Sequence, residues 1–231
     1  MISHWLKASL LVPLILVIAL AQGPPIENGP FRQPDLLELT KLDASIKLDI
    51  RYATRNNFLG KAVYKQSRAF LQRPAAEALA RVNQALRKQG YGLVVFDGYR
   101  PWSVTKVFWD VTPADKKIFV ADPSKGSRHN RGCAVDLSLV DLKTGAEVKM
   151  PSEYDEMTER AHINYECATP EAKRLRELLR EAMAGGRVCC LRTGVVALRL
   201  QRLEGVSNHE PQVLRDKVVS STNLRRLLRS H

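Results

Sequence analysis

His129 and Asp136 lie seven residues apart on a stretch rich in small residues. Zinc readily binds a neutral imidazole nitrogen and a carboxylate oxygen, and a catalytic site takes three protein ligands and leaves a fourth position for water. Seven residues are too many for one helical face, and residues 133–140 are typical of a buried strand. The spacing therefore suits a zinc ligand at His129 on a loop and a second at Asp136 on the following strand. Ordinary hydrogen bonding at the surface is the alternative that spacing alone leaves open.

Arg100 is a second candidate for chemistry. It follows the apolar run 93–96 and precedes Pro101, which favours an extended backbone at this position. A guanidinium keeps its charge and offers a planar fork of donors. Aimed at a scissile carbonyl, it can stabilise the oxyanion of a tetrahedral intermediate. An ion pair with Asp97 is the simpler alternative.

Ser127 and the acidic segment 150–162 complete the set of candidates. Ser127 has no triad partners, so we expect it to contact substrate or support the loop of His129 and not to act as a nucleophile. The segment 150–162 is also compatible with a solvated charged face. We expect its His162 to be structural rather than a ligand.

Four motifs, taken in order, resemble those of the zinc D-alanyl-D-alanine peptidases, and within them the D-alanyl-D-alanine dipeptidases. The stretch 127–136 has the pattern Ser-x-His-x-x-Gly-x-Ala-x-Asp. The other three are Asp-Ile-Arg-Tyr-Ala-Thr at 49–54 with Asn57-Phe58, Asp-Gly-Tyr-Arg-Pro at 97–101, and the segment 150–162. Together they cover roughly residues 35 to 185.

The resemblance implies a specific chemistry for these positions. His129 and Asp136 would bind one zinc ion, and Arg100 would stabilise the transition state. Ser127 and Asp155 would bind the substrate, with an acid of the segment 150–162 holding the free amine of a dipeptide. The reaction would be hydrolysis of D-alanyl-D-alanine to two D-alanines. The related alternative is a D,D-carboxypeptidase or endopeptidase that acts on murein peptides.

The elements that must position these residues suggest an α+β fold with a small, mostly antiparallel sheet and helices packed on it. Alternation predicts a half-buried strand at 45–53, and short apolar runs predict strands at 93–96 and 133–140, with another at 147–150 after a turn. Apolar residues at helical spacing predict helices at 74–89 and from 169 to about 184. Residues 102–110 are also expected to be helical, and 115–125 to form a polar connection that can contain a short helix.

The N-terminus is typical of an exported protein. Residues 1–21 combine a weakly basic start, an apolar run at 10–20 and an Ala-Leu-Ala cleavage pattern, which predicts a signal peptide. An uncleaved anchor is the alternative. Residues 22–36 are expected to be a flexible lead-in and 37–186 the zinc dipeptidase domain. We therefore expect a periplasmic or extracellular protein with no stable membrane span after cleavage.

The C-terminal residues 187–231 depart from the family pattern. The resemblance predicts a Glu-x-x-His motif, usually Glu-Trp-Trp-His, that supplies the general base and the third ligand. No such motif is present, and no Phe, Tyr or Trp follows Gly185. This segment carries a net charge of +6 of the total +12 and contains the adjacent Cys189 and Cys190. The acid and imidazole of Glu204 and His209 have the wrong spacing to replace the motif.

A frameshift accounts for this departure. Residues 194–201 can be encoded GGA GTG GTG GCA CTT CGA CTA C, and reading from the second base gives Glu-Trp-Trp-His-Phe-Asp-Tyr. We infer a one-base frameshift between about Ala184 and Val188, in the gene or in its sequencing. The basic tail is then a product of the shifted frame, so we expect no nucleic-acid partner. Hydrolysis by the chain as written is expected to be impaired, and a catalytically dead cell-wall peptide-binding protein is the non-enzymatic alternative.

Overall fold

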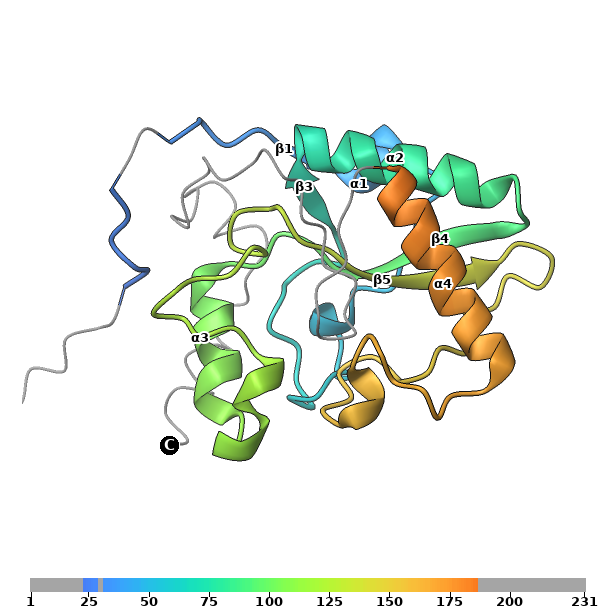
Figure 1. Cartoon of the computed structure of the whole chain (residues 1–231). Coiled ribbons are helices and arrows are strands. Elements are labelled where there is room, and N and C mark those ends of the chain that lie inside the picture. The colour runs from blue at the N-terminus through green and yellow to red at the C-terminus, as the bar shows by residue number, and fades with distance from the viewer. Residues whose placement is uncertain (1–22, 29–30, 187–231) are drawn as a thin grey trace, which may run out of the picture.

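The computed structural model describes residues 23–28 and 31–186 (Figure 1). The predicted signal peptide at 1–21 and the predicted basic tail at 187–231 lie outside this part of the chain. Within it, helices pack against two small β-sheets, so the predicted α+β class is confirmed. A search of the described helices for one long and apolar enough to cross a membrane finds none.

The larger sheet has three strands in the order β2-β4-β5. Strand β4 pairs antiparallel with β5 and parallel with β2, so the sheet is mixed. The register of β4 and β5 shifts between Val95 and Asp97, which sets Asp97 opposite Asp136. Such irregularities change the direction of a side chain near a functional site. The strands span Lys47–Leu48 (β2), Tyr91–Asp97 (β4) and Asp136–Asp141 (β5).

A second, two-stranded sheet and most of the short helical turns were not predicted. The exception is the turn Ala114–Phe119, in the polar connection for which a short helix was considered. Strands β1 and β3 pair antiparallel. Each has only three residues, too few to show a periodic pattern in the sequence. The elements are β1 (Leu36–Glu38), α1 (Leu39–Leu42), β3 (Phe70–Gln72) and the 3-10 turns η1 (Arg51–Ala53), η2 (Ala114–Phe119) and η3 (Glu159–Ala161).

Helices α2 (Arg73–Arg87) and α4 (Pro170–Gly185) pack against each other, α2 also against β4 and α4 also against β5. Each has a proline in its first turn, where the missing N–H costs no hydrogen bond within the helix. The hydroxyl of Thr169 caps α4 by accepting a hydrogen bond from the N–H of Ala172 at 3.2 Å. The buried stripe of α2 forms much of the core through residues at helical spacing, namely Ala75, Ala76, Leu79, Val82 and Leu86.

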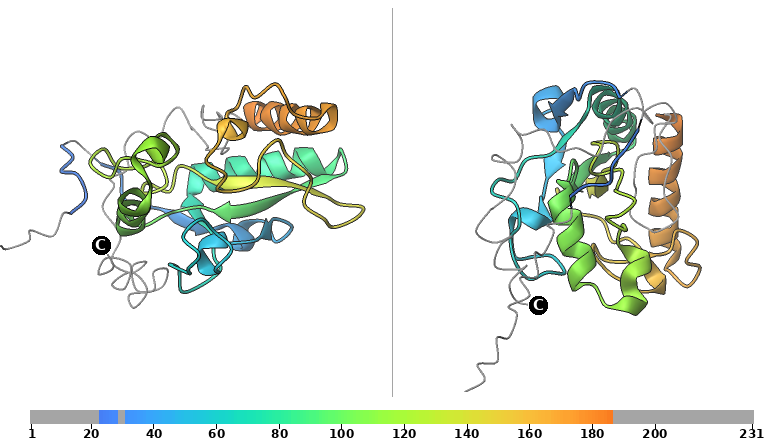
Figure 2. Two further views of the ribbon diagram at one scale, coloured as in Figure 1. Left: turned by 90° about the horizontal axis from the view of Figure 1, so that it is seen from below. Right: turned by 90° about the vertical axis from the view of Figure 1, so that its left-hand side faces the viewer.

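Helix α3 (Trp102–Val111) lies at the opposite end of the molecule from α4, as Figure 1 and the left-hand view of Figure 2 show. The indole of Trp102 donates a hydrogen bond to the carbonyl of Pro123 at 2.9 Å. This contact ties α3 to the segment that leads into residues 127–133. The loop that carries His129 therefore lies between α3 and the central sheet.

Two predicted strands are much shorter than expected. Only Lys47–Leu48 of the segment 45–53 is a strand, because the chain then turns into η1. The carbonyl of Tyr52 accepts hydrogen bonds from the N–H groups of Val63 and Tyr64 at 2.8 and 2.9 Å, which directs the chain away from the sheet. The strand predicted at 147–150 is reduced to an isolated bridge between Val140 and Glu147.

Candidate metal centre and active site

The loops that follow β4 and precede β5 are joined at the candidate site. The backbone N–H of Arg100 donates to the carbonyl of His129 at 3.0 Å, and the side-chain amide of Asn130 donates to the carbonyl of Arg100 at 2.8 Å. Gly132 has a φ of 66°, a left-handed conformation that glycine adopts without strain. The chain can therefore turn between His129 and Asp136 and bring both to the end of the sheet.

The facing atoms of His129 and Asp136 have the separation expected of two zinc ligands. Nε2 of His129 lies 3.2 Å from Oδ1 of Asp136. Two ligand atoms about 2.1 Å from a tetrahedral zinc ion lie about 3.4 Å apart. Both residues are buried, and Oδ1 of Asp136 has no hydrogen-bond partner within the described residues. A buried carboxylate oxygen without a partner is costly, and a cation at this point would satisfy it.

A second contact of His129 prepares its ring for metal binding. Nδ1 lies 2.9 Å from the carbonyl oxygen of Gly98. A carbonyl can only accept, so Nδ1 carries the proton and Nε2 of the neutral ring is left with its lone pair. Gly98 is itself constrained, because a Cβ there would lie 2.9 Å from the carbonyl oxygen of Phe70. The ring is thus oriented by the backbone, and Nε2 is directed at Asp136.

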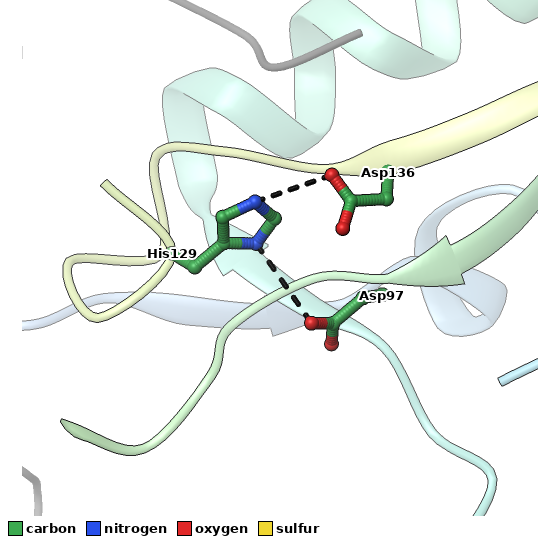
Figure 3. A group of neighbouring side chains, drawn as sticks. All are labelled: Asp97, His129 and Asp136. Carbon is green, nitrogen blue, oxygen red and sulfur yellow. Dashed lines mark ion pairs between the residues drawn. The ribbon is translucent and has the colours of Figure 1, made fainter. Parts of the chain in front are cut away.

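Asp97 lies close to this pair but on the wrong side of the ring to share its ion. The ligand atoms of Asp97, His129 and Asp136 all lie within 4.8 Å of one another. However, the carboxylate of Asp97 faces Nδ1 at 4.0 Å, whereas Asp136 faces Nε2 (Figure 3). Because Nδ1 already donates to Gly98, an ion on Nε2 would be bound by two of these residues and not by three. No other group of three potential ligands occurs in the described part of the chain.

Arg100 faces this pair and also forms the predicted ion pair with Asp97. Its Nε and Nη2 both lie 2.8 Å from Oδ2 of Asp97, and Nη2 lies 3.3 Å from Oδ2 of Asp136. The guanidinium lies over the ring of Phe108 at 4.6 Å and over that of Tyr52 at 5.6 Å. The two interpretations of Arg100 are therefore compatible, since the ion pair holds the side chain at the candidate site.

Asp136 is kept ionised by its neighbours. Burial disfavours the charged carboxylate, but the charge and hydrogen bond of a protonated His129 ring, together with Arg100 and the hydroxyl of Tyr154, outweigh this and lower its pKa. A divalent cation would take the place of the proton on Nε2. The Tyr154 hydroxyl donates to Oδ2 of Asp136 at 3.4 Å. A carboxylate that is ionised at neutral pH, with one oxygen directed at a bare imidazole nitrogen, is the form that binds a divalent cation.

All five residues predicted to form the site line one cavity of about 360 Å³. Its walls come from η2, the loop 127–133, β5, the segment 147–163 and α4. Many of its other lining residues are apolar or aromatic. The predicted site residues that it brings together are Arg100, Ser127, His129, Asp136 and Asp155.

The cavity follows the free edge of β5. Asp136, Leu137 and Ser138 all line it, although their side chains alternate between the two faces of the strand. Farther along β5, the N–H of Val148 donates to the carbonyl of Leu139 at 3.0 Å and covers the edge there. Beside Asp136, no strand in the described residues pairs with this edge. The cavity therefore reaches the buried pair formed by His129 and Asp136 along this edge.

Ser127 and Asp155 occupy different parts of the cavity wall. The hydroxyl of Ser127 accepts a hydrogen bond from the N–H of His129 at 3.2 Å, which supports the loop of the candidate ligand. Asp155 has a φ of 61°, a strained value for a residue other than glycine. Its carboxylate accepts hydrogen bonds from the Tyr52 hydroxyl at 2.7 Å and the Phe58 N–H at 3.2 Å. It is therefore held in the wall and is not part of a solvated face.

Burial raises the pKa of Asp155 to about 6, although the hydrogen bonds from Tyr52 and Phe58 act in the opposite direction. The nearby negative charge of Asp136 also raises it, and Arg100 lowers it. A carboxyl group with a raised pKa in a cavity is a candidate for binding a cationic group, because a positive ligand restores its charge.

Several residues at the site were missed or undervalued in the sequence. Tyr64 is buried and its hydroxyl donates to Oδ1 of Asp97 at 2.9 Å, but nothing in its sequence context indicates this role. Tyr52 belonged to a recognised motif, yet its contacts with Asp155 and Arg100 depend on the fold. His162 packs on Phe119 with ring centroids 5.7 Å apart and is absent from the candidate metal group.

The two described cysteines are free thiols, with Cys133 buried and Cys167 exposed. Burial raises the pKa of Cys133 to about 11. Cys133 is thus a small core residue and not a reactive group beside the metal motif.

Comparison with known proteins places this site in a family context. A family model described as D-ala-D-ala dipeptidase matches residues 32–192. A D-alanyl-D-alanine dipeptidase of Escherichia coli is 36% identical over 152 residues, which cover 66% of this chain and 77% of the relative. An Enterococcus faecium protein of the same name is 36% identical over 142 residues, covering 54% and 70%. A Streptomyces coelicolor protein of that name is 32% identical over 146 residues, covering 55% and 72%.

Proposed function

The chain belongs to the D-ala-D-ala dipeptidase family, and we propose that it is by descent a zinc enzyme that hydrolyses the D-alanyl-D-alanine dipeptide to two D-alanines. The observation that carries this proposal is Oδ1 of Asp136, which has no hydrogen-bond partner within the described residues and lies 3.2 Å from Nε2 of His129 in a cavity. The names of the relatives support the substrate.

In this proposal the residues of the cavity divide the work of hydrolysis. His129 and Asp136 would hold a zinc ion, whose contribution when bound is polarisation of the scissile carbonyl and activation of water. Arg100 would donate hydrogen bonds to the oxyanion that develops on the carbonyl oxygen. The carboxylate of Asp155 would bind the free ammonium group of the dipeptide, and Ser127 would steady the loop of His129.

We propose further that the chain as written is strongly impaired. His129 and Asp136 supply two of the three protein ligands of a catalytic zinc site, and no residue in the described part supplies the third. The general base that would take the proton from water is also missing there. The absence of Glu-x-x-His from residues 187–231, and its recovery in the shifted reading frame, support a frameshift as the cause. The family match ends at residue 192, just before the shifted motif would begin.

The same proposal includes export from the cytoplasm. It is supported by the basic start, apolar run and Ala-Leu-Ala pattern of residues 1–21. Its substrate, an alanine dipeptide of D configuration, is related to cell-wall peptides, which an exported enzyme would meet.

Asp155 tests whether the substrate is a free dipeptide or the end of a murein peptide. In a protein whose frame is restored by removing one base upstream of Val188, we expect D-alanyl-D-alanine to be cleaved at least about 30-fold more efficiently than its N-acetylated form. The reason is that loss of one partner from a buried charge pair costs about 2 kcal/mol or more. Asp155→Asn should lower kcat/KM for the free dipeptide by a similar factor and leave the acetylated peptide unaffected.

The pH dependence supplies a second readout for Asp155. The carboxyl group binds an ammonium group when ionised, and its pKa of about 6 means that it becomes protonated as the pH falls through 6. We expect kcat/KM for the free dipeptide to fall about tenfold per pH unit below that value. Asp155→Asn should lose this limb, whereas Glu159→Gln, an exposed carboxylate of the same segment, should keep it. Equal cleavage of free and acetylated peptides by all three proteins would favour the carboxypeptidase alternative.

A further inference from the structure

Asp97 takes part in the site without facing the candidate metal position. It is 1% exposed, and its carboxylate makes a full set of contacts. Oδ1 accepts hydrogen bonds from the Tyr64 hydroxyl and the Gly98 N–H, both at 2.9 Å. Oδ2 accepts a hydrogen bond from Nε of Arg100 at 2.8 Å, and Nη2 of Arg100 lies 2.8 Å from the same oxygen. Tyr64, Gly98 and Arg100 thus fix the carboxylate of Asp97, which in turn binds the Nε side of the guanidinium.

The guanidinium of Arg100 lies between two buried carboxylates that compete for it. Its contact with Asp97 is 2.8 Å, whereas its contact with Asp136 is 3.3 Å. Arginine stays charged and pairs most strongly with a carboxylate when two N–H groups engage it. Asp97 has the closer contacts, a hydrogen bond from Nε to its Oδ2 and an ion pair of Nη2 with the same oxygen, both at 2.8 Å. Asp136 accepts a single, longer hydrogen bond from Nη2 to Oδ2, and its Oδ1 has no hydrogen-bond partner within the described residues.

We propose that Asp97 is a positioning residue that holds the Arg100 guanidinium away from Asp136 and thereby keeps Oδ1 of Asp136 free to bind a divalent cation. This inference rests on the proposed metal site at His129 and Asp136. Without the charge of Asp97, the guanidinium would move onto Asp136 as the remaining buried carboxylate. The cation would then have to displace a charged two-point pair.

A second route by which Asp97 could influence the metal passes through His129, whose Nδ1 lies 4.0 Å from it. A negative charge there would strengthen Nε2 as a ligand, independently of Arg100. The two routes differ in one respect. Only the route through Arg100 disappears when the guanidinium is removed, so a double-mutant cycle separates them.

The experiment is a Zn²⁺ titration of the full chain as written, in competition with a chromophoric chelator, and it needs no catalytic activity. We expect Asp97→Asn to weaken Zn²⁺ binding about tenfold or more, the usual effect of losing an outer-shell partner. In the Arg100→Met background, the same Asp97→Asn change should weaken binding less than about threefold. An equal loss in both backgrounds, or no loss in either, would overturn the proposal.

Two further variants keep the test decisive. Tyr64→Phe removes one hydrogen bond to Asp97 and no charge, so we expect about a threefold loss of Zn²⁺ affinity that vanishes with Arg100→Met. If the thermal melt shows that Asp97→Asn is unfolded, Tyr64→Phe, measured with and without Arg100→Met, tests in the same way whether Asp97 acts through Arg100. His129→Ala tests the metal site itself. If it leaves Zn²⁺ binding intact, the proposed metal site is wrong, whereas a loss with His129→Ala but not with Asp97→Asn overturns the inference alone.

Discussion

Restoring the reading frame is expected to raise kcat/KM for D-alanyl-D-alanine by about 10³-fold or more. The change is removal of one base between the codons of Ala184 and Val188, after which the codons from Gly194 onward can read Glu-Trp-Trp-His. A positioned general base alone contributes about 10² to 10⁴ in rate. A third ligand would also tighten zinc binding at His129 and Asp136. The measurement is release of D-alanine by the two purified proteins under the same zinc concentration.

Removal of two bases at the same place is the matched control. This variant also has a new C-terminal tail, but its reading frame does not encode Glu-Trp-Trp-His. We therefore expect it to cleave the dipeptide as slowly as the chain as written. Asp136→Asn in the restored protein should return the activity to the low level. If the chain as written already binds zinc stoichiometrically and cleaves the dipeptide as fast as the restored protein, the proposed impairment is wrong. Nucleotides that cannot encode the motif in any frame would exclude the frameshift.

Arg100→Met in the restored protein is expected to lower kcat for the dipeptide by about 10² to 10³, with a small change in KM. Removal of one donor that stabilises an oxyanion typically has this effect, because the interaction forms in the transition state. Arg100 is suited to this role because Asp97, Asp136 and the ring of Phe108 fix its plane. The measurement is steady-state kinetics over a range of dipeptide concentrations.

The loss of Arg100 also leaves two carboxylates without their partner, so stability must be followed in parallel. Breaking a buried ion pair in this way costs about 3–5 kcal/mol of unfolding free energy. The double variant Asp97→Asn with Arg100→Met removes most of that cost and should show the same low kcat. Arg160→Met is the control at the rim of the cavity, where the side chain donates to the Pro151 carbonyl. Unchanged kcat in Arg100→Met would contradict the assigned role.

The elements that sequence periodicity predicted well are those whose pattern is local. Helix α2 was predicted at 74–89 and observed as Arg73–Arg87, because its apolar stripe and its proline lie within one segment. The buried run at 93–96 likewise identified β4, and the apolar residues at helical spacing from 169 onward identified α4. In each case the residues that form the element also contain the signal that marks its ends.

The elements and contacts that were missed depend on distant partners. Strand β3 exists because Phe70–Gln72 pairs with β1, and three residues carry no period of their own. The strand predicted at 45–53 stops early because the Tyr52 carbonyl is bonded to residues 63 and 64. Alternation of side chains cannot reveal such a turn, since it depends on which backbone groups find partners.

The site was predictable in its residues and not in its geometry. The motifs identified His129, Asp136 and Arg100, but their spacing does not show that Nδ1 of His129 is occupied by Gly98. Asp97 was considered only as a partner of Arg100. The shift of register in β4 that places it opposite Asp136 has no mark in the sequence.

The most direct test of the central claim is anomalous diffraction from zinc-soaked crystals of the protein. We predict one anomalous peak per chain, about 2.0–2.2 Å from both Nε2 of His129 and Oδ1 of Asp136. Asp97 should stay bound to Arg100 on the other side of the imidazole. A peak bound by Nδ1 and Asp97, or a cavity without any peak under conditions that saturate the protein with zinc, would contradict the account.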